Sequence, residues 1–279
     1  MVYNIPTLES NEFRTLFSII WCLEMKLSNS VKQKIICLIQ TRMDSTRLPG
    51  KAMKLINGKP MIYRVFQALS KSNSIGKIVI VTSENKNDNE LIKFLEKNNM
   101  EYFRGSKDDV LDRYYQAAKK LGADLIIRIT GDCPLIDSDI VDSVIEKVIR
   151  NNLDYASNVE VRTFPRGYDV EVFTYETLKK IHQSTNDPDD REHVTLYLRR
   201  NQNLFKIGNI TAQESKSHPE WRVCVDTKQD LDLIRKIFMR YRKKNRITYE
   251  DVIEFFKKYP KMTDVNKKIE QKRIKNRVF

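Results

Sequence analysis

The sequence has few of the residues that build flexible, disulfide-linked or zinc-binding proteins. Its 279 residues include only 8 Gly and 8 Pro, so no long flexible linker is visible. The four cysteines are scattered without a C-x-x-C pair, and only three histidines accompany them. This pattern argues against a zinc site and predicts a reduced, cytoplasmic protein. The apolar stretch at residues 16–23 is too short to span a bilayer and lacks a basic flank and a small-residue cleavage site.

The net charge of +13 is concentrated near the C-terminus. From Arg235 to Phe279 there are 16 Lys and Arg against 5 Asp and Glu, so the rest of the chain is nearly neutral. Such a segment either binds nucleic acid or anionic lipid, or is a solvated helical end. No aromatic-interleaved RNA motif or zinc finger accompanies it, which favours the second interpretation. We therefore expect neither nucleic acid nor a membrane as a partner.

Three segments are expected along the chain. The 41% hydrophobic content suffices for one sizeable core, which we place in a central domain at 34–245. Residues 1–33 are left outside this domain, either as an added amphipathic helix or as residues upstream of a natural start at Met25. Residues 246–279 are expected to form a basic helical extension.

Buried strands alternate with helices through the first half of the chain. Continuous apolar runs predict strands buried on both faces, and apolar residues three or four apart predict helices. The expected strands are 35–41, 77–83, 101–105 and 124–130, and the expected helices are 60–72, 89–98, 108–121 and 138–150. This alternation indicates parallel βαβ units and a mostly parallel sheet.

Beyond residue 151 the pattern becomes mixed and predicts a partly antiparallel region. The strand-like segments are 154–158, 168–173, 205–210 and 221–227. Helices are expected near 191–200, 229–242, 249–258 and 264–275.

Three cations follow the first strand within ten residues. Arg42, Arg47 and Lys51 lie in "IQTRMDSTRLPGK". This loop is not a Walker A phosphate loop, because Ser45 stands at the first glycine position and Ala52 follows the lysine, and it is not G-x-G-x-x-G either. In those loops backbone amides bind the phosphate oxygens, so here the cations must take over that binding. Two guanidiniums and an ammonium suit a polyphosphate, and the alternative is an ordinary charged surface loop.

Two aspartates follow other predicted strands. Asp132 comes after "IIRIT" and Asp226 after "WRVCV". Ligands of open α/β sheets gather at the carboxyl ends of strands, where a carboxylate needs a cation. Mg²⁺ takes such hard oxygen ligands when a nucleotide supplies the rest. The alternative for each aspartate is a turn or a helix cap, and Asp226 in "VDTKQDL" is well placed as a cap.

Six blocks in order resemble a known family. They are "IQTRMDSTRLPGK", "RGSKDDVLDRYYQAA", "RITGDCPLID", "PRGYDVEVF", "REHVT" and "WRVCVDTKQDL". Over roughly residues 34 to 274 the chain resembles the spore-coat polysaccharide branch of the sugar-acid cytidylyltransferases, relatives of the 3-deoxy-manno-octulosonate and acylneuraminate cytidylyltransferases. The resemblance implies an α/β nucleotide-diphospho-sugar transferase (GT-A-like) fold, a three-layer α/β/α sandwich with a mixed, mainly parallel sheet, as a homodimer.

The resemblance also implies an activity and the residues that perform it. CMP would move from CTP to a sugar acid or related polar acceptor with release of pyrophosphate, in surface polysaccharide or glycan precursor synthesis. The implied nucleotide-binding residues are Arg42, Ser45, Arg47, Lys51, Gly105, Ser106 and Asp132. The implied catalytic residues are Arg47, Lys51, Asp132 and Asp226, and the two aspartates would hold Mg²⁺. The proton acceptor is left open between a metal-bound hydroxyl and the Asp226 carboxylate.

The acceptor is expected to bind to the second half of the chain. The residues expected to contact it are Asn158, Arg166, Asp169, Glu171 and His193. Asp169 and Glu171 fall on one face of a predicted strand, which is either a solvated edge or a site for acceptor hydroxyls. Arg166 or Arg162 would meet an acceptor carboxylate. For His193 and for Asn158, the alternative is a structural role.

Two other functions stay open from the sequence. A GT-A glycosyltransferase would share this fold type and use an Asp-x-Asp metal motif, which Asp137 and Asp139 offer. Asp132 lies nearer a strand end, however, and the cationic loop suits a triphosphate better than a nucleotide sugar. The other alternative is a binding protein whose basic tail docks on nucleic acid or membrane.

Overall fold

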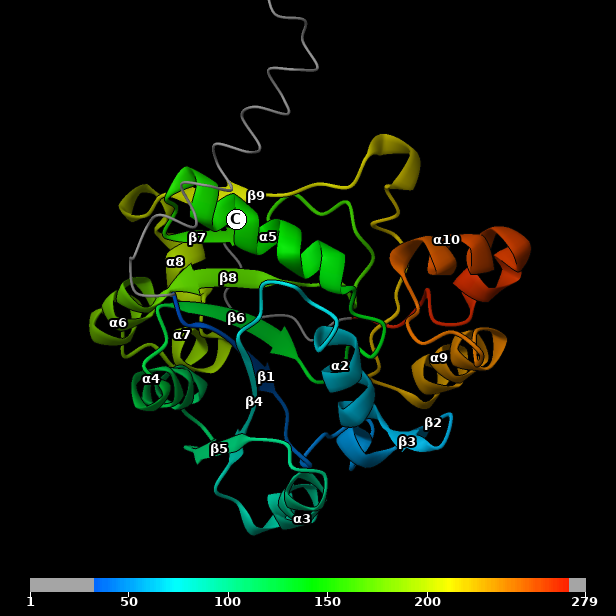
Figure 1. Ribbon diagram of the computed structural model, residues 1–279, viewed down its shortest axis with the longest axis horizontal. Helices are drawn as coiled ribbons and strands as arrows, with labels where there is room; N and C mark the ends of the chain where they lie inside the picture. The colour runs from blue at the N-terminus through cyan, green and yellow to red at the C-terminus, as the bar shows by residue number, and fades with distance from the viewer. Residues whose placement is uncertain (1–32, 271–279) are drawn as a thin grey trace, which may run out of the picture. The chain divides into compact units, whose positions relative to one another are not determined.

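The computed structural model describes residues 33–270, which fold around one seven-stranded sheet in the order β5-β4-β1-β6-β8-β7-β9 (Figure 1). The strands are β1 (Ile35–Gln40), β4 (Lys77–Ser83), β5 (Tyr102–Gly105), β6 (Leu125–Thr130), β7 (Tyr155–Ser157), β8 (Glu171–Thr174) and β9 (Ile207–Asn209). The first four are parallel, whereas β8 runs antiparallel to β6 and β7. A separate hairpin pairs β2 (Leu55–Ile56) with β3 (Lys59–Pro60). The segment predicted at 1–33 lies outside the described residues, except for Gln33.

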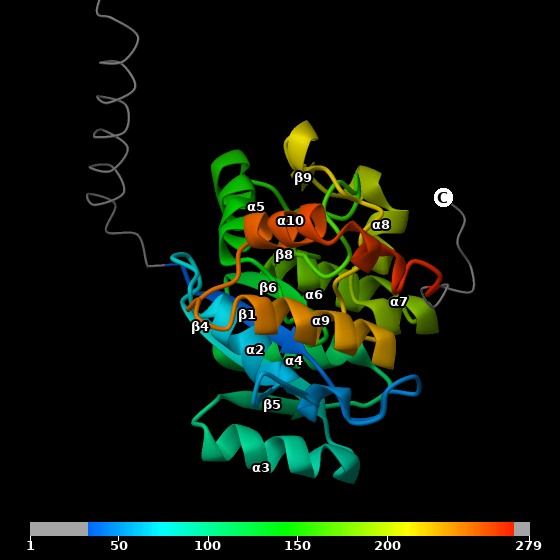
Figure 2. The same ribbon diagram turned by 90° about the vertical axis from the view of Figure 1, so that its right-hand side faces the viewer.

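Helices cover both faces of the sheet, because successive side chains of β1 point to opposite faces and are buried on both. Ile36 and Leu38 share a core with α4 (Val110–Leu121), α6 (Tyr175–Ser184) and α8 (Leu196–Arg200). Cys37 and Ile39 share the other core with α2 (Met61–Leu69), α3 (Asn89–Lys97), α5 (Ser138–Asn151), α9 (Lys228–Arg240) and α10 (Tyr249–Lys258). Figures 1 and 2 show α3 beside the β5 edge of the sheet, at the opposite end from β9. The predicted three-layer sandwich is confirmed.

Most predicted elements lie where the hydrophobic pattern placed them. The strand at 77–83 and the helix at 249–258 agree residue for residue, and the remaining first-half elements differ by at most three residues at an end. These segments carry complete apolar stripes, so their local pattern and their tertiary burial agree. None of the helices in the described part is long and apolar enough to cross a membrane.

The predicted strand at 221–227 is wrong. The middle of this segment is buried, but it joins no sheet and forms a single bridge between Arg222 and Arg166. Its amides bind loops instead: Val223 N donates to Arg166 O at 2.7 Å, and Val225 N donates to Asp132 O at 2.8 Å. The side chains of Val223 and Val225 are buried in the core, which explains why this segment has the apolar pattern of a strand. Asp226 therefore follows a buried loop segment rather than a strand.

Two other predictions need correction, and one helix was missed. The single helix near 191–200 is two short helices, α7 (Pro188–His193) and α8, because Val194 adopts a positive φ of 57° between them. The helix α6 was not predicted. The helix expected at 264–275 is absent from its described part: a short 3-10 helix, η5 (Pro260–Asp264), is followed by turns and loop at 265–270. Residues 271–275 lie outside the described part.

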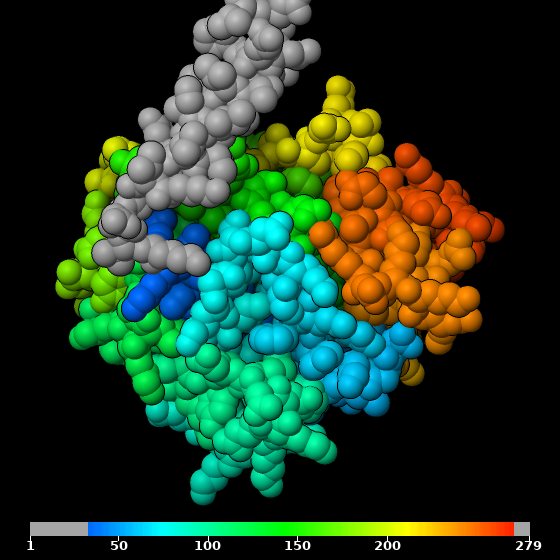
Figure 3. Space-filling model, in the orientation of Figure 1, coloured from blue at the N-terminus to red at the C-terminus, as the bar shows by residue number. Residues whose placement is uncertain are grey.

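The C-terminal helices pack on the same layer as the hairpin and α2. Figure 3 shows α9 and α10 in orange and red against the blue and cyan segments, and Arg235 Nε of α9 donates to Leu55 O at 2.9 Å. Asp137 connects α10 to α5: it caps α5 through Asp139 N at 2.9 Å, accepts from Tyr249 N at 2.7 Å, and pairs with Arg246.

Replacing Asp137 with Ala should lower the free energy of unfolding by about 3 kcal/mol. The change removes a helix cap and leaves the Tyr249 N–H and the Arg246 guanidinium without their buried partner. Urea unfolding measures the loss. Asp139→Ala is the control, because its carboxylate also pairs with Arg246 but is 70% exposed, and we expect a change within about 0.5 kcal/mol. Equal stability of the two variants would contradict this account of the junction.

Candidate active site

A cleft of about 260 Å³ opens where β1 and β6 end. It is lined by the loop after β1, by residues 130–132 at the end of β6, and by side chains from α4, α7 and the segment before α9. Seven of the residues predicted for the site line this cleft: Arg42, Ser45, Arg47, Lys51, Asp132, His193 and Asp226. Parallel strands end at the same edge of a sheet, so this is where a ligand was expected.

The ammonium of Lys51 lies between the two predicted metal ligands. Its Nζ is 2.8 Å from Asp132 Oδ2 and 2.8 Å from Asp226 Oδ1, and it donates to Val225 O at 3.0 Å. Burial alone would lower the pKa of Lys51, but the two carboxylates outweigh burial and raise that pKa above its ordinary value. The lysine is therefore a permanent cation, and the two aspartates converge on one point.

The backbone of the first loop places Lys51. Gly50 has φ 63°, a left-handed conformation that favours glycine, and precedes a short 3-10 helix, η1 (Lys51–Met53). Gly50 N donates to Met43 O at 3.1 Å. Met43 N in turn donates to Asp88 Oδ1 at 2.7 Å, and Asp88 is itself buried and accepts from Ser83 N at 3.0 Å. The loop is thus fixed from behind by a carboxylate that the sequence analysis did not identify.

Asp226 is surrounded by cations. Its Oδ2 accepts from Arg222 Nη2 at 2.6 Å and from Arg47 Nη2 at 2.9 Å, while Lys51 occupies Oδ1. Burial would raise the pKa of Asp226, but Lys51 and the two arginines lower it overall. Asp226 does not cap α9, because Thr227 is the cap and forms a capping box with Asp230.

Asp132 reaches the cleft because β1 and β6 end close together. A Cβ on Gly131 would lie 2.8 Å from Thr41 Cβ, so only glycine allows this approach. Asp132 Oδ1 accepts a hydrogen bond from Thr130 Oγ1 at 2.6 Å. The hydroxyl leaves Oδ2 directed toward Lys51.

Arg113 is a cleft residue that the sequence analysis missed. It is 1% exposed, and its Nε and Nη2 donate to Ser106 O at 2.8 and 2.6 Å. Gly105 and Ser106 lie behind this arginine rather than on the cleft wall, since a Cβ on Gly105 would meet Arg113 Cγ at 2.9 Å. The available signal was an arginine on the apolar face of α4, three residues after Val110.

Glu171 is a buried counter-ion rather than a cleft residue. It pairs with Arg128, which does line the cleft, and it accepts from Tyr155 Oη at 2.9 Å and Thr195 Oγ1 at 2.6 Å. Burial would raise the pKa of Glu171, but Arg128 and these hydrogen bonds lower it overall. Its carboxylate is therefore ionised and fully engaged within the fold, which corrects the expectation of a strand-face acceptor contact.

Asn158 and Asp169 also lie off the cleft wall. Asn158 is buried, and its amide donates to Tyr168 O at 2.7 Å and accepts from Val170 N at 2.9 Å. Both ends of that amide are engaged in the fold, so a structural role fits it. Asp169 precedes β8 and forms a two-point ion pair with Arg162, with N–O distances of 2.6 and 2.9 Å.

Arg166 lies in this same region without a carboxylate partner among residues 33–270. Burial and the neighbouring Arg162 lower the pKa of Arg166. Its backbone is tied to the segment before Asp226, because Arg166 N donates to Trp221 O at 3.1 Å and Arg166 O accepts from Val223 N. Arg166 is thus attached to the loop that carries one of the site carboxylates.

His193 lines the cleft at the end of α7. Thr195 N donates to His193 O at 2.6 Å across Val194, whose φ of 57° and ψ of −59° describe a rare, strained γ-turn. Val194 is β-branched and fully buried, so packing must hold the turn. Burial lowers the pKa of His193.

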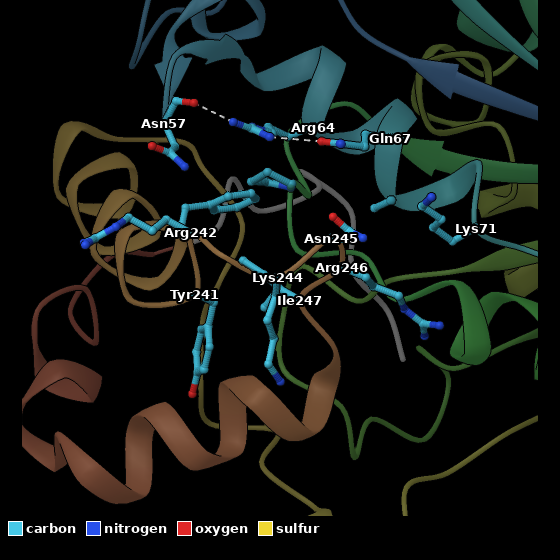
Figure 4. Close-up of a pocket in the computed structure, with 13 residues that line it drawn as sticks. Asn57, Arg64, Gln67, Lys71, Tyr241, Arg242, Lys244, Asn245, Arg246 and Ile247 are labelled. Atoms are coloured by element: carbon cyan, nitrogen blue, oxygen red, sulfur yellow. Dashed lines mark hydrogen bonds between the residues drawn. The ribbon is translucent and has the colours of Figure 1, made fainter.

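A second cavity, of about 290 Å³, lies between α2 and the loop after α9 (Figure 4). Arg64 is held on its wall by Ile56 O and Gln67 Oε1, both at 3.0 Å. Figure 4 shows Lys244 and Arg246 pointing away from Arg64, and these two pair with Asp251 and Asp137. No carboxylate lines this cavity, so it does not offer the ligands of a metal-nucleotide site.

The Asp-x-Asp pair required by the glycosyltransferase alternative does not reach the cleft. Asp137 caps α5 and binds Arg246 and Tyr249, and Asp139 pairs with the same arginine. Both aspartates line a separate hollow next to α10. The pair therefore stabilises a helix junction.

Known proteins resemble this chain over most of its length. The profile of the cytidylyltransferase family matches residues 36–269. The uncharacterised protein MJ1063 of Methanocaldococcus jannaschii is 33% identical over 86% of this chain and 97% of its own length. The spore coat polysaccharide biosynthesis protein SpsF of Bacillus subtilis is 29% identical over 81% of this chain and 95% of its own.

Solved structures show the same fold. A cytidylyltransferase from Leptospira borgpetersenii superposes with a TM-score of 0.80 at 33% identity, covering 86% of this chain and 100% of that one. A CMP:2-keto-3-deoxy-manno-octonic acid synthetase in complex with CTP superposes at 0.59 with 19% identity over 75% of this chain and 100% of that one, which is a likeness of fold. The family profile, the sequence identity to these relatives and the shared fold show that this chain belongs to the cytidylyltransferase family and is an enzyme of that class.

Proposed function

We propose that this cytidylyltransferase moves CMP from CTP to a sugar acid or related polar acceptor, in a Mg²⁺-dependent reaction that releases pyrophosphate. One observation carries the proposal: the Lys51 ammonium is held between Asp132 and Asp226 in a cleft rimmed by arginines. A site that pairs convergent carboxylates with an excess of cations matches a ligand that is itself a polyanion with a bound divalent cation.

The cations of the first loop would hold the triphosphate. Arg42, Arg47 and Lys51 all line the cleft, and Arg113 lies beside them. An acceptor oxygen attacks the α-phosphorus in line, so catalysis consists mostly of positioning and charge neutralisation. Charge growing on the leaving pyrophosphate would be met by Lys51 and Arg47, and a well-placed donor of this kind contributes about 3 kcal/mol.

The residues present fit a divalent cation. Asp132 and Asp226 offer hard oxygen ligands, and the Lys51 ammonium lies where they converge, so a divalent cation would take carboxylate positions that Lys51 leaves open. No group of three or more His, Cys, Asp or Glu that could hold a metal ion occurs among the described residues, so phosphate oxygens would have to complete its ligands. Mg²⁺ needs few protein ligands when phosphates and water supply the rest. When bound, it would lower the repulsion between the phosphate oxygens and the incoming acceptor oxygen.

Asp226 is better suited to placing charge than to removing a proton. Both of its oxygens accept from cations, and its pKa is lowered. A carboxylate with a lowered pKa is a weak base, so it contributes little to proton transfer. Its value to the reaction would be a fixed negative charge opposite Asp132.

The acceptor would bind on the side of Asp226 that carries Arg166. A sugar acid brings a carboxylate, and Arg166 is a half-buried guanidinium without an ion-pair partner in the part of the chain that the structure describes. The Arg162–Asp169 pair next to it would order the pocket, and the free edges of Asp169 would accept hydrogen bonds from acceptor hydroxyls.

Several finer points stay predictions. A role in surface polysaccharide or glycan precursor synthesis, a cytoplasmic location and a homodimer rest on the resemblance and on the cysteine pattern. Binding of nucleic acid or membrane by the basic tail concerns residues that lie partly outside the described part. The Asp-x-Asp pair that the glycosyltransferase alternative requires begins with Asp137, which caps α5 instead of lining the cleft.

Selective stabilisation by CTP would test the nucleotide. With Mg²⁺ present, CTP should raise the melting temperature more than ATP, GTP or UTP, because a ligand that binds only the folded state stabilises it. Thermal unfolding of the four mixtures measures this. Pyrophosphate release with CTP and a panel of sugar acids then tests the reaction. Consumption of a nucleotide sugar without any pyrophosphate would overturn the proposal.

Replacing Lys51 with Ala should reduce kcat at least about 100-fold, since an electrostatic donor to the transferred phosphates is lost. Steady-state pyrophosphate release measures the change, and circular dichroism checks the fold. Lys54→Ala is the matched control, because Lys54 is three residues away and exposed, and it should retain full activity. A fully active Lys51→Ala enzyme would mean that the loop does not bind the triphosphate.

Replacing Arg166 with Ala should raise KM for a sugar acid about 10- to 100-fold and leave KM for CTP nearly unchanged. The reason is that a charge-assisted contact to the acceptor carboxylate is worth roughly 1.5–3 kcal/mol. Kinetics with each substrate varied in turn separate the two constants. If KM for CTP changes instead, Arg166 serves the nucleotide and the acceptor lies elsewhere.

A further inference from the structure

The segment that follows α10 returns to the active site. After η5 the chain runs as turns and loop through residues 265–270, where Asn266 is only 2% exposed. Its side-chain amide donates to Arg222 O at 3.0 Å and to Asp230 Oδ1 at 2.8 Å. Both N–H groups of this buried amide are therefore engaged.

Asp230 connects Asn266 to the site. It is fully buried, and its Oδ2 accepts from Asp226 N at 3.0 Å and Thr227 N at 2.9 Å. Its Oδ1 accepts from Arg222 Nε at 3.0 Å and from Asn266. A buried carboxylate is costly unless its oxygens are hydrogen-bonded, and the amide of Asn266 supplies one of the hydrogen bonds that Asp230 receives.

Arg222 connects Asp230 to Asp226. Its Nε is held by Asp230, while its Nη2 donates to Asp226 Oδ2 at 2.6 Å. Asn266 holds the same arginine from the other side, through its backbone oxygen. The orientation of the Asp226 carboxylate, and hence the aim of its Oδ1 at Lys51, depends on Arg222 and Asp230 together.

The far end of the segment meets the first loop. Arg47 Nη1 donates to Glu270 O at 3.0 Å, and Arg47 Nη2 pairs with Asp226 Oδ2 at 2.9 Å. The Arg47 side chain is 32% exposed, so these two contacts largely decide where its guanidinium points. Residues 266 and 270 are thus both connected to Asp226, Asn266 through Arg222 and Asp230, and Glu270 through Arg47.

We propose that residues 265–270 form a strap that completes the active site, with Asn266 as a positioning residue for Asp226. This inference rests on the proposed function, in which Asp226 helps to hold the metal-nucleotide complex. Asn266 touches no reacting atom in this scheme. It fixes the Arg222–Asp230 pair, and the strap fixes Arg47.

The test compares Asn266→Ala with the wild type and with Thr263→Ala in the full-length chain. Thr263 is a matched control, because it lies three residues away and its hydroxyl donates to Pro260 O at 2.8 Å within η5. We expect Asn266→Ala to lower kcat about 10- to 100-fold, because small errors in position are costly to catalysis. Thr263→Ala should stay within about twofold of the wild type.

Calorimetric titration of CTP with and without Mg²⁺ gives a readout besides turnover. The wild type should bind CTP more tightly with Mg²⁺, and Asn266→Ala should lose most of that increment while keeping its metal-free affinity. If the alanine variant does not fold, Asn266→Ser replaces it in the test. Serine retains a hydroxyl donor and removes less volume, so this variant should lose part of the Mg²⁺-dependent gain in CTP affinity.

The outcomes separate the two levels of the proposal. A wild type without any Mg²⁺-dependent gain in CTP affinity would count against the proposed function. A wild type with that gain, together with Asn266 variants that melt earlier but keep the same gain and the same kcat, would show that the strap is only structural and would overturn this inference.

Discussion

The charge arrangement at Lys51 is the constraint on which the rest of the site depends. One ammonium is shared by Asp132 and Asp226, which come from segments 81 and 175 residues further along the chain. Two carboxylates this close would repel each other, and the ammonium cancels that repulsion before any ligand arrives. The ends of β1 and β6 and the loop before α9 must therefore meet at one point. The fold serves to bring these three segments together.

Buried ion pairs orient the side chains around that point. Arg128 is neutralised by Glu171 from β8, and Arg222 is neutralised by Asp230 from α9. Charged groups at such depth are tolerated only when each one is paired and hydrogen-bonded. The consequence for function is preorganisation, since the cleft residues are oriented by partners that do not themselves face the ligand.

Local patterns predicted the layers of the fold well and the irregular segments poorly. The strand β4 and the helix α10 have full apolar periodicity, and their predicted bounds hold. The segment 221–227 reads as a strand because buried loops and buried strands carry the same residues. Glu171 was expected to contact the acceptor because it shares a predicted strand face with Asp169, and Asn158 was left open to a structural role, but partners within the fold occupy both of them.

The sequence by itself determined the α/β layering, the cationic loop that ends at Lys51, and the family, because each is written in contiguous residues. Only the tertiary structure decided which charges neutralise one another. It placed Lys51 between two distant aspartates, Arg113 on the cleft wall and Asn266 behind the site. Hydrophobic periodicity specifies which face of an element is buried. The partners in a buried ion network come from distant parts of the sequence, so no local pattern predicts which of them will meet.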